Sequence, residues 1–290
     1  MIFRRLTAKN CLEKIFKFSF LYTPFLALTV SCGPFFPANK PFFWKVEKNE
    51  KISYFLGTFH YGIPLEDLPC SKTILTKLRN SDLVLTELGS GVQDAQKEEW
   101  EKTFKLSPNN EDFNQLSPES QRFLEQNGIS KELTYFHLNY YLTILCLKKA
   151  VGEETALTSM DVQVRSAAIY FNIPSQALDT LKLRKPGIKY HTTKEDIENK
   201  IKNFHLCPKY IQYGIAAYKM GNKLFTTKGL NKWLHNRYST SESDKWLLKH
   251  RNEKWATQFK EAHENHDHIF IAAGSFHFTE PFNLIDMLRR

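Results

Sequence analysis

The chain has 290 residues, 42% of them hydrophobic, so it is long enough to bury a core without depending on disulfides or metals. Its net charge is +9, but five basic residues and one acidic residue precede Cys32, which leaves a surplus of about +5 for the rest of the chain, where both signs are mixed. This distribution argues against a nucleic-acid-binding protein.

The amino terminus has the pattern of an export signal. Residues 1–17 are basic and mixed, and Phe18–Val30 is an apolar run that is too short to cross a bilayer comfortably. Cys32 follows small residues, which resembles a bacterial lipobox in which the cysteine sulfur is lipidated, although Thr29 stands where leucine is usual. We predict a lipoprotein-type signal peptide at 1–32; ordinary cleavage nearby and an uncleaved anchor are the alternatives.

Residues 33–41 are rich in proline and are predicted to be a tether. Two strand-like runs, Phe42–Glu47 and Ile52–Leu56, flank the polar stretch Lys48–Lys51, which predicts a hairpin. The second strand leads to Gly57, where the absence of a side chain would permit a turn that brings His60 back over the strand end.

Helical and strand-like patterns follow in turn. They predict helices at 72–80, within 93–152, at 160–171, within 190–262 and at 281–290, and strands at 82–88, 173–178 and 268–273. Within the long helical part, Ser117 and Pro118 mark a helix start. The prediction is one mixed α/β (α+β) domain at 42–290, with a small central sheet built from both ends of the chain and a long helical insertion.

The five cysteines include no CxxC pair, so neither a zinc ribbon nor a thioredoxin-type site is indicated. If Cys11 is removed and Cys32 is modified, Cys70, Cys146 and Cys207 remain. Those three residues form at most one disulfide, or they are three buried thiols.

Three predicted strands each end near a side chain that can bind a metal: His60, Glu87 and His277. Each histidine ends a glycine-x-x-histidine stretch that begins at Gly57 or Gly274. Two imidazoles and a carboxylate suit zinc, manganese, cobalt or iron, whose bound water supplies hydroxide for hydrolysis. The alternative is that both histidines lie in turns and the glutamate is solvated. The histidine-rich run 263–268 is predicted to be an exposed turn.

The paired glycine-x-x-histidine stretches, together with Leu85-Thr86-Glu87 and Arg251-Asn252, resemble the TraB/PrgY/GumN family, which includes the TIKI proteins. Trp44-Lys45-Val46, Met160-Asp161, Leu178-Asp179-Thr180 and Tyr218-Lys219-Met220-Gly221-Asn222 extend the resemblance, although the family more often has glutamate at the position of Asp179. The resemblance runs from about residue 42 to the carboxyl terminus and is poor at 93–150 and 185–215.

The resemblance implies a divalent metal ion, described as manganese or cobalt in the TIKI branch, bound by His60, Glu87 and His277. Glu87 and Arg251 are then the candidate catalytic residues; Arg251 would stabilise negative charge or orient a carboxylate. Gly57 and Gly274 would shape the turns. Asp161 would hold an imidazole in its tautomer or cap a helix.

Two functions follow from this set of residues. The first is an exported, lipid-anchored metal-dependent hydrolase, namely a metallopeptidase with a peptide or protein substrate. The second is a non-catalytic lipoprotein of the cell envelope that binds a peptide or another ligand.

Overall fold

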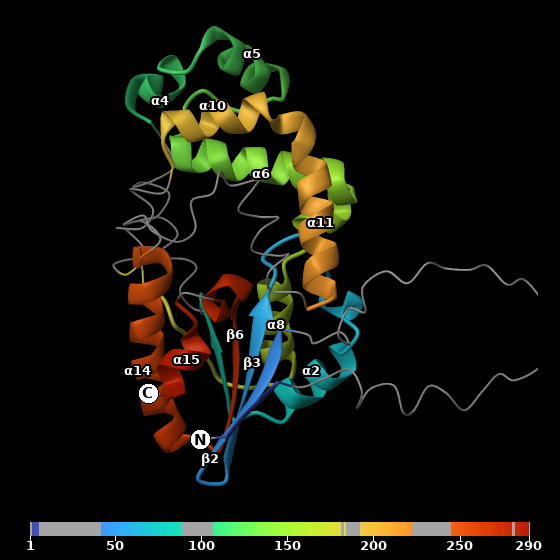
Figure 1. Ribbon diagram of the computed structural model, residues 1–290, viewed down its shortest axis with the longest axis vertical. Coiled ribbons are helices and arrows are strands. Elements are labelled where there is room, and N and C mark those ends of the chain that lie inside the picture. The colour runs from blue at the N-terminus through green and yellow to red at the C-terminus, as the bar shows by residue number, and fades with distance from the viewer. Residues whose placement is uncertain are drawn as a thin grey trace, which may run out of the picture.

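A computed structural model describes residues 2–5, 42–88, 107–180, 183, 192–221, 245–279 and 282–289. Within this part of the chain, a six-stranded sheet has the order β1-β2-β3-β6-β4-β5 (Figure 1). The strands are β1 (Ile2–Arg5), β2 (Phe43–Lys48), β3 (Lys51–Thr58), β4 (Leu83–Thr86), β5 (Ser175–Ala177) and β6 (His268–Gly274). Because β6 pairs with β3, the sheet joins the two ends of the sequence, and the predicted mixed α/β fold is confirmed.

The predicted hairpin is present as β2 and β3, which pair in antiparallel fashion. Asn49 and Glu50 join them, and both have positive φ angles, of 52° and 65°. Two consecutive residues with positive φ are the requirement of the tight hairpin turn whose twist matches that of the strands. The polar stretch therefore forms the turn that the sequence predicts.

At the edge of the sheet, β1 pairs with β2 in antiparallel fashion, from Ile2 opposite Glu47 to Arg5 opposite Trp44. This strand lies inside the segment predicted to be a signal peptide. Cys32, the apolar run 18–30 and the predicted tether 33–41 lie outside the described residues.

The other four strands are parallel to one another, in the order β3-β6-β4-β5. β6 lies between β3 and β4, although about 180 residues separate it from β4 in sequence. The carboxyl ends of all four strands therefore meet at one edge of the sheet, which is where open α/β sheets bind ligands. We call this the carboxyl edge.

Helices cover both faces of the sheet. α14 (Arg251–Asn265) and α15 (Leu284–Arg289) lie on one face, and α2 (Ser71–Arg79) and α8 (Met160–Tyr170) lie on the other (Figure 1). The ring of Phe55 lies 5.1 Å from that of Phe259 in α14. The preceding residue, Tyr54, has the Lys77 ammonium group of α2 5.3 Å from its ring. Successive residues of β3 thus contact opposite layers, as the alternation of a strand requires.

The helical insertion has a core of its own. Its helices are α4 (Glu111–Asn114), α5 (Pro118–Gln126), α6 (Tyr135–Val151), α7 (Glu153–Leu157), α10 (Lys194–Lys202) and α11 (Cys207–Lys219). Ser117 caps α5 by accepting from the N–H of Ser120, as its place before Pro118 predicts. Leu138 and Leu142 of α6 are fully buried here, against Leu124 and Ile197, and not against the sheet.

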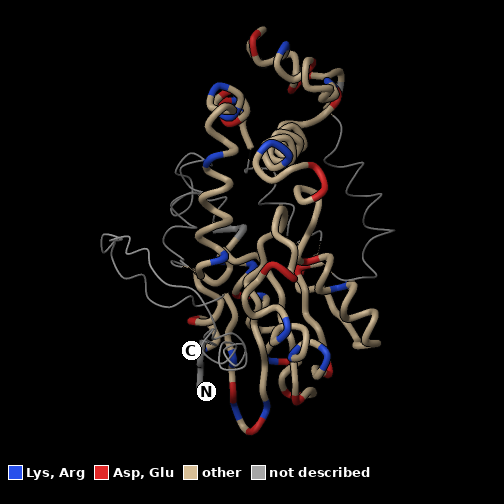
Figure 2. Tube along the Cα trace, turned by 90° about the vertical axis from the view of Figure 1, so that its right-hand side faces the viewer, with Lys and Arg blue, Asp and Glu red and all other residues tan. Residues whose placement is uncertain are grey.

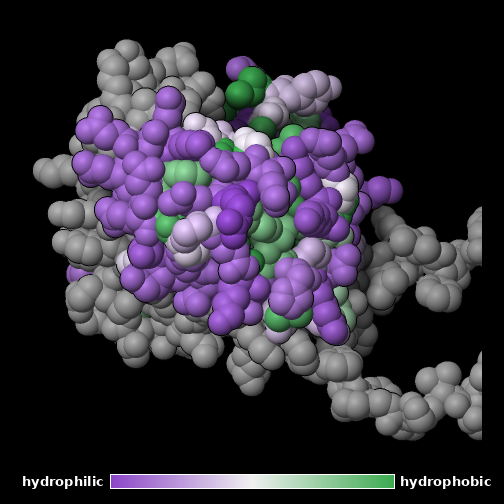
Figure 3. Space-filling model, turned by 90° about the horizontal axis from the view of Figure 1, so that it is seen from above, coloured by the Kyte–Doolittle hydropathy of each residue, from purple (hydrophilic) through white to green (hydrophobic). Residues whose placement is uncertain are grey.

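Five shorter segments complete the described part of the chain: η1 (Leu65–Asp67), η2 (Pro108–Asn110), η3 (Phe204–Leu206), the π-helical η4 (Lys245–His250) and η5 (Ser275–Phe278). Figure 2 shows basic and acidic residues interspersed along the described trace. Seen from above, the surface over the helical insertion is mostly hydrophilic, with small hydrophobic patches (Figure 3). Within the described ranges, no helix is both long and apolar enough to cross a membrane.

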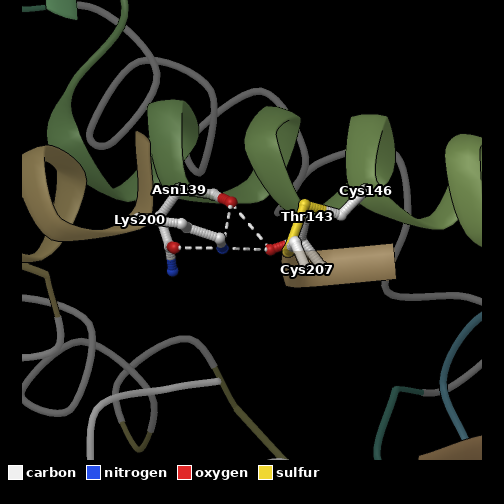
Figure 4. Close-up of a disulfide and its surroundings, with 5 residues drawn as sticks. All are labelled: Asn139, Thr143, Cys146, Lys200 and Cys207. Carbon is white, nitrogen blue, oxygen red and sulfur yellow. Dashed lines mark hydrogen bonds between the residues drawn. A yellow bond between two sulfur atoms is a disulfide. The ribbon is translucent and has the colours of Figure 1, made fainter. Parts of the chain in front are cut away.

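Two buried contacts tie α6 to its neighbours (Figure 4). A disulfide joins Cys146 to Cys207 at the start of α11, whereas Cys70 is buried in the core around the sheet. From α10, the Lys200 ammonium group donates to Asn139 Oδ1 (2.6 Å) and to Thr143 Oγ1 (2.7 Å). Burial lowers the pKa of Lys200 to about 7, and nearby Asp196 opposes this shift only in part. The sequence left one disulfide and three thiols as alternatives, and the structure has the disulfide.

Candidate active site at the carboxyl edge of the sheet

Polar side chains follow each of the four parallel strands at the carboxyl edge. His60 lies two residues beyond β3, Glu87 directly follows β4, and Asp179 lies two residues beyond β5. His277 lies in η5, which continues from β6. Because β6 lies between β3 and β4, the strand order brings the two histidines and the glutamate together.

The Glu87 carboxylate lies at the centre of the site and is 5% exposed. Its Oε1 accepts from the N–H of Gly274 (2.7 Å), and its Oε2 pairs with Arg251 Nη2 (2.7 Å). The Nε2 atoms of His60 and His277 lie 3.8 Å and 3.7 Å from the same Oε1. The structure therefore brings together the three side chains that the sequence singled out as candidate metal ligands.

The contacts of His277 fix which of its ring nitrogens carries hydrogen. Asn252 donates through Nδ2 to two backbone carbonyls, those of His277 (3.0 Å) and Phe282 (2.6 Å). Its Oδ1 is then the atom that lies 2.5 Å from His277 Nδ1, and an amide oxygen only accepts. Nδ1 accordingly carries a hydrogen, and Nε2 is the ring nitrogen that faces Glu87 and could bind a metal ion.

The same arrangement holds for His60, with a carboxylate in place of the amide. Asp161 Oδ2 lies 2.7 Å from His60 Nδ1, and Asp161 Oδ1 accepts from the Thr58 hydroxyl (2.7 Å). Ser159 caps α8 through its side chain, so Asp161 faces the histidine instead of serving as the cap. Partners of this kind on the second ring nitrogen are typical of metal-binding histidines.

Arg251 joins two strand ends through their carboxylates. It pairs with Glu87 and also with Asp179, whose Oδ2 lies 2.6 Å from Nη2 and whose Oδ1 lies 3.1 Å from Nε. Burial alone would lower the pKa of Arg251, but Glu87 and Asp179 outweigh burial and raise it. Two roles for Arg251 were predicted from the sequence, stabilising negative charge or orienting a carboxylate. These contacts favour the second role.

Gly57 and Gly274 do not serve as turn residues, in contrast to the sequence prediction. Gly57 lies within β3, and Gly274 ends β6 with a φ of −50°, so neither needs the left-handed conformation. Glycine is required at both positions because a side chain would not fit. A Cβ atom on Gly274 would lie 2.7 Å from His60 Nε2 and 3.1 Å from Glu87 Oε1, and one on Gly57 would lie 3.1 Å from Phe278. Gly274 thus makes room for the site itself.

The donor set fits a divalent cation in its chemistry. Two imidazole nitrogens lie within 3.8 Å of one carboxylate oxygen, and Glu87, Asp161, Asp179 and Arg251 leave a formal charge of −2. The nitrogen–oxygen separations of 3.7–3.8 Å are slightly wider than the roughly 3.4 Å between two ligands that are each about 2.1 Å from a tetrahedral ion. Among the described residues, no group of three His, Cys, Asp or Glu side chains already has metal-binding geometry.

Three further residues of the site were not assigned from the sequence: Asp179, Asn252 and Trp255. Trp255 Nε1 donates to Asp179 (2.9 Å), and its ring centroid lies 4.2 Å from that of His277. Asp179 follows a strand as Glu87 does, so the rule that identified Glu87 also applies to it. Asn252 and Trp255 lie on a helix, so the rule that polar residues at strand ends form the site does not identify them.

The histidine-rich run 263–268 is not simply an exposed turn, which corrects the prediction. His263 belongs to α14 and is 9% exposed, with Nδ1 3.4 Å from Ser53 Oγ. Burial, aided by Lys51, lowers the pKa of His263. Ser53 lies near the start of β3, so this histidine is at the opposite edge of the sheet from the site.

Comparison with protein-family models gives a match over residues 42–290 to the TraB/PrgY/gumN family. Comparisons with curated proteins and with solved structures find no match. The matched range begins just before β2 and includes every side chain of the site described above. Because the match covers most of the chain, this protein belongs to the TraB/PrgY/gumN family.

Proposed function

We propose that this protein is a metal-dependent hydrolase, namely a metallopeptidase acting on a peptide or protein. The observation that carries the proposal is that two imidazoles, each bonded at Nδ1 to a buried partner, place their Nε2 atoms within 3.8 Å of one carboxylate oxygen. When bound, a manganese, cobalt or zinc ion would supply a water acidic enough to deliver hydroxide near neutral pH.

The side chains around this point have separable roles. His277 and Glu87 are buried and form the floor of the site, while the His60 side chain is 52% exposed and is the part that a substrate would reach. Asp161 and Asn252 hold the two imidazoles in the tautomer that a cation needs. Arg251 holds the Glu87 carboxylate and so acts as a positioning residue.

Metal analysis of the purified protein tests this proposal. We expect about one equivalent of a divalent metal in the wild-type protein, and at least a tenfold loss of metal affinity in His60→Ala and in His277→Ala. His268→Ala is the matched control, because His268 begins β6 at the other edge of the sheet. Equal metal content in all four proteins would contradict the proposed metal site.

A ligand-binding protein without turnover is the second candidate, and the contacts of Glu87 favour it. Both of its oxygens already accept from the protein, one from Gly274 and the other from Arg251, as in a structural carboxylate. Cleavage of a peptide library that stops on addition of a chelator supports the hydrolase. Peptide binding that survives the chelator, without cleavage, supports the binding protein.

We also propose that the protein is exported and anchored to a bacterial membrane through lipidated Cys32. The buried disulfide between Cys146 and Cys207 supports export, since disulfides persist in oxidising compartments. Cleavage before Cys32 would also remove β1, the edge strand, and leave the family-matched range intact.

Cys32→Ser tests the anchor. The variant should move from the membrane fraction to the soluble fraction, because a serine hydroxyl cannot carry the thioether-linked lipid. Cys70→Ser is the control, since Cys70 lies in the core of the sheet and should not affect fractionation. An unchanged membrane fraction in Cys32→Ser, with the amino-terminal segment intact by mass spectrometry in the wild-type protein, would contradict the lipoprotein assignment.

A further inference from the structure

Tyr218, on α11 of the helical insertion, contacts two segments that form the site. Its side chain is 2% exposed, and its ring stacks on that of Phe42 with centroids 5.1 Å apart. The hydroxyl donates to the backbone carbonyl of Gly57 (2.5 Å) and lies 3.4 Å from the sulfur of Met160. One side chain of the insertion thus touches the strand that leads to His60 and the residue before Asp161.

The place of Gly57 explains why this hydroxyl is needed. In a strand, the N–H and C=O of one residue point to the same side, and those of Gly57 point toward β2. β2 begins at Phe43, and the carbonyl of Phe42 already accepts from the Gly57 N–H (2.7 Å). The Gly57 carbonyl therefore lies where β2 starts, and Tyr218 provides it with a buried donor.

From Gly57 the contacts lead directly to the imidazole of His60. The next residue, Thr58, donates to Asp161 Oδ1, and the other oxygen of Asp161 binds His60 Nδ1. Asp161 follows Met160 in the first turn of α8, so a shift of either segment would change the Asp161–His60 contact. Burial, followed by the charge of Asp161, raises the pKa of Tyr218 well above its ordinary value, so the hydroxyl keeps its proton.

We infer that Tyr218 is a positioning residue for His60. Its hydroxyl contacts both the Gly57 carbonyl and the Met160 sulfur, and it thereby fixes the end of β3 relative to the start of α8. This keeps the hydrogen bonds that join Thr58, Asp161 and His60 in place. This gives the helical insertion a direct part in the site. The inference deepens the proposed function, because His60 is one of the proposed metal ligands, but its test does not depend on metal or turnover.

The test measures the tautomer of His60 by nitrogen NMR of the metal-free protein, with the His60 signals assigned through His60→Gln. In the wild-type protein we expect His60 to be predominantly protonated at Nδ1. In Tyr218→Phe the ratio of the Nδ1–H to the Nε2–H form should fall about three- to tenfold, the effect of weakening one hydrogen bond. Tyr54→Phe is the matched control, since Tyr54 is buried in the same core and stacks on Phe43.

An effect on stability alone would lower the melting temperature of Tyr218→Phe and leave the His60 signals of the folded protein unchanged, and this outcome would overturn the inference. If Tyr218→Phe does not fold, Met160→Ala provides the second variant, because it removes the sulfur that the hydroxyl contacts. Unchanged His60 signals in folded Met160→Ala would then overturn the inference. A changed tautomer in a protein that binds no metal would leave the inference intact and contradict the proposed function.

Discussion

Replacing Arg251 with methionine is expected to lower the free energy of unfolding by about 3–5 kcal/mol, the range for removing one partner of a buried ion pair. Methionine keeps most of the volume of the side chain but leaves Glu87 and Asp179 buried without the guanidinium that both of them bind. Their side chains are 6% and 0% exposed, so water cannot replace that partner. Urea unfolding of the two proteins at pH 7 measures the difference.

The control for this prediction is the same substitution at Arg289, which pairs with Asp286 on the exposed side of α15. Arg289→Met should cost about 1 kcal/mol or less, as exposed ion pairs do. The loss in free energy of unfolding should be smaller in the double variant Arg251→Met/Asp179→Asn than in Arg251→Met, because one of the unpaired charges is then absent. A loss below about 1 kcal/mol in Arg251→Met would show that the two carboxylates do not depend on the guanidinium.

The strands at the carboxyl edge could be predicted because each is a short apolar run that ends in a polar residue. His60, Glu87 and His277 were found in this way. Asp179 obeys the same rule, since it directly follows the predicted strand at 173–178 and lies two residues beyond β5. The order of the strands in the sheet could not be predicted from hydrophobic periodicity, because β6 lies between β3 and β4 but comes from the far end of the chain.

The residues that orient the site were harder to predict because helical spacing identifies an apolar face but not its partner. α14 presents Asn252 to His277 and Trp255 to Asp179, and both contacts depend on how α14 lies across the sheet. The same limit applies to the apolar residues of α6. They pack in a second core within the insertion, and no local pattern distinguishes one core from the other.

Loss of the disulfide between Cys146 and Cys207 is expected to lower the free energy of unfolding by about 2–4 kcal/mol. The two cysteines are 61 residues apart in sequence, so the bond removes much of the freedom of the unfolded chain. Both side chains are fully buried, and the bond joins α6 to the first residue of α11. Unfolding of Cys146→Ala/Cys207→Ala, compared with that of the wild-type protein, measures the effect.

The wild-type protein in a strong reductant should approach the stability of the double variant, while the variant itself should not respond to the reductant. Cys70→Ala provides the matched control, since it removes a buried thiol outside the disulfide and should keep its response to the reductant. Because the bond acts mainly on the unfolded chain, the His60 tautomer of the folded double variant should match that of the wild-type protein, unlike that of Tyr218→Phe. Alkylation of Cys146 and Cys207 in freshly isolated native protein would contradict both the disulfide and the oxidising compartment that it supports.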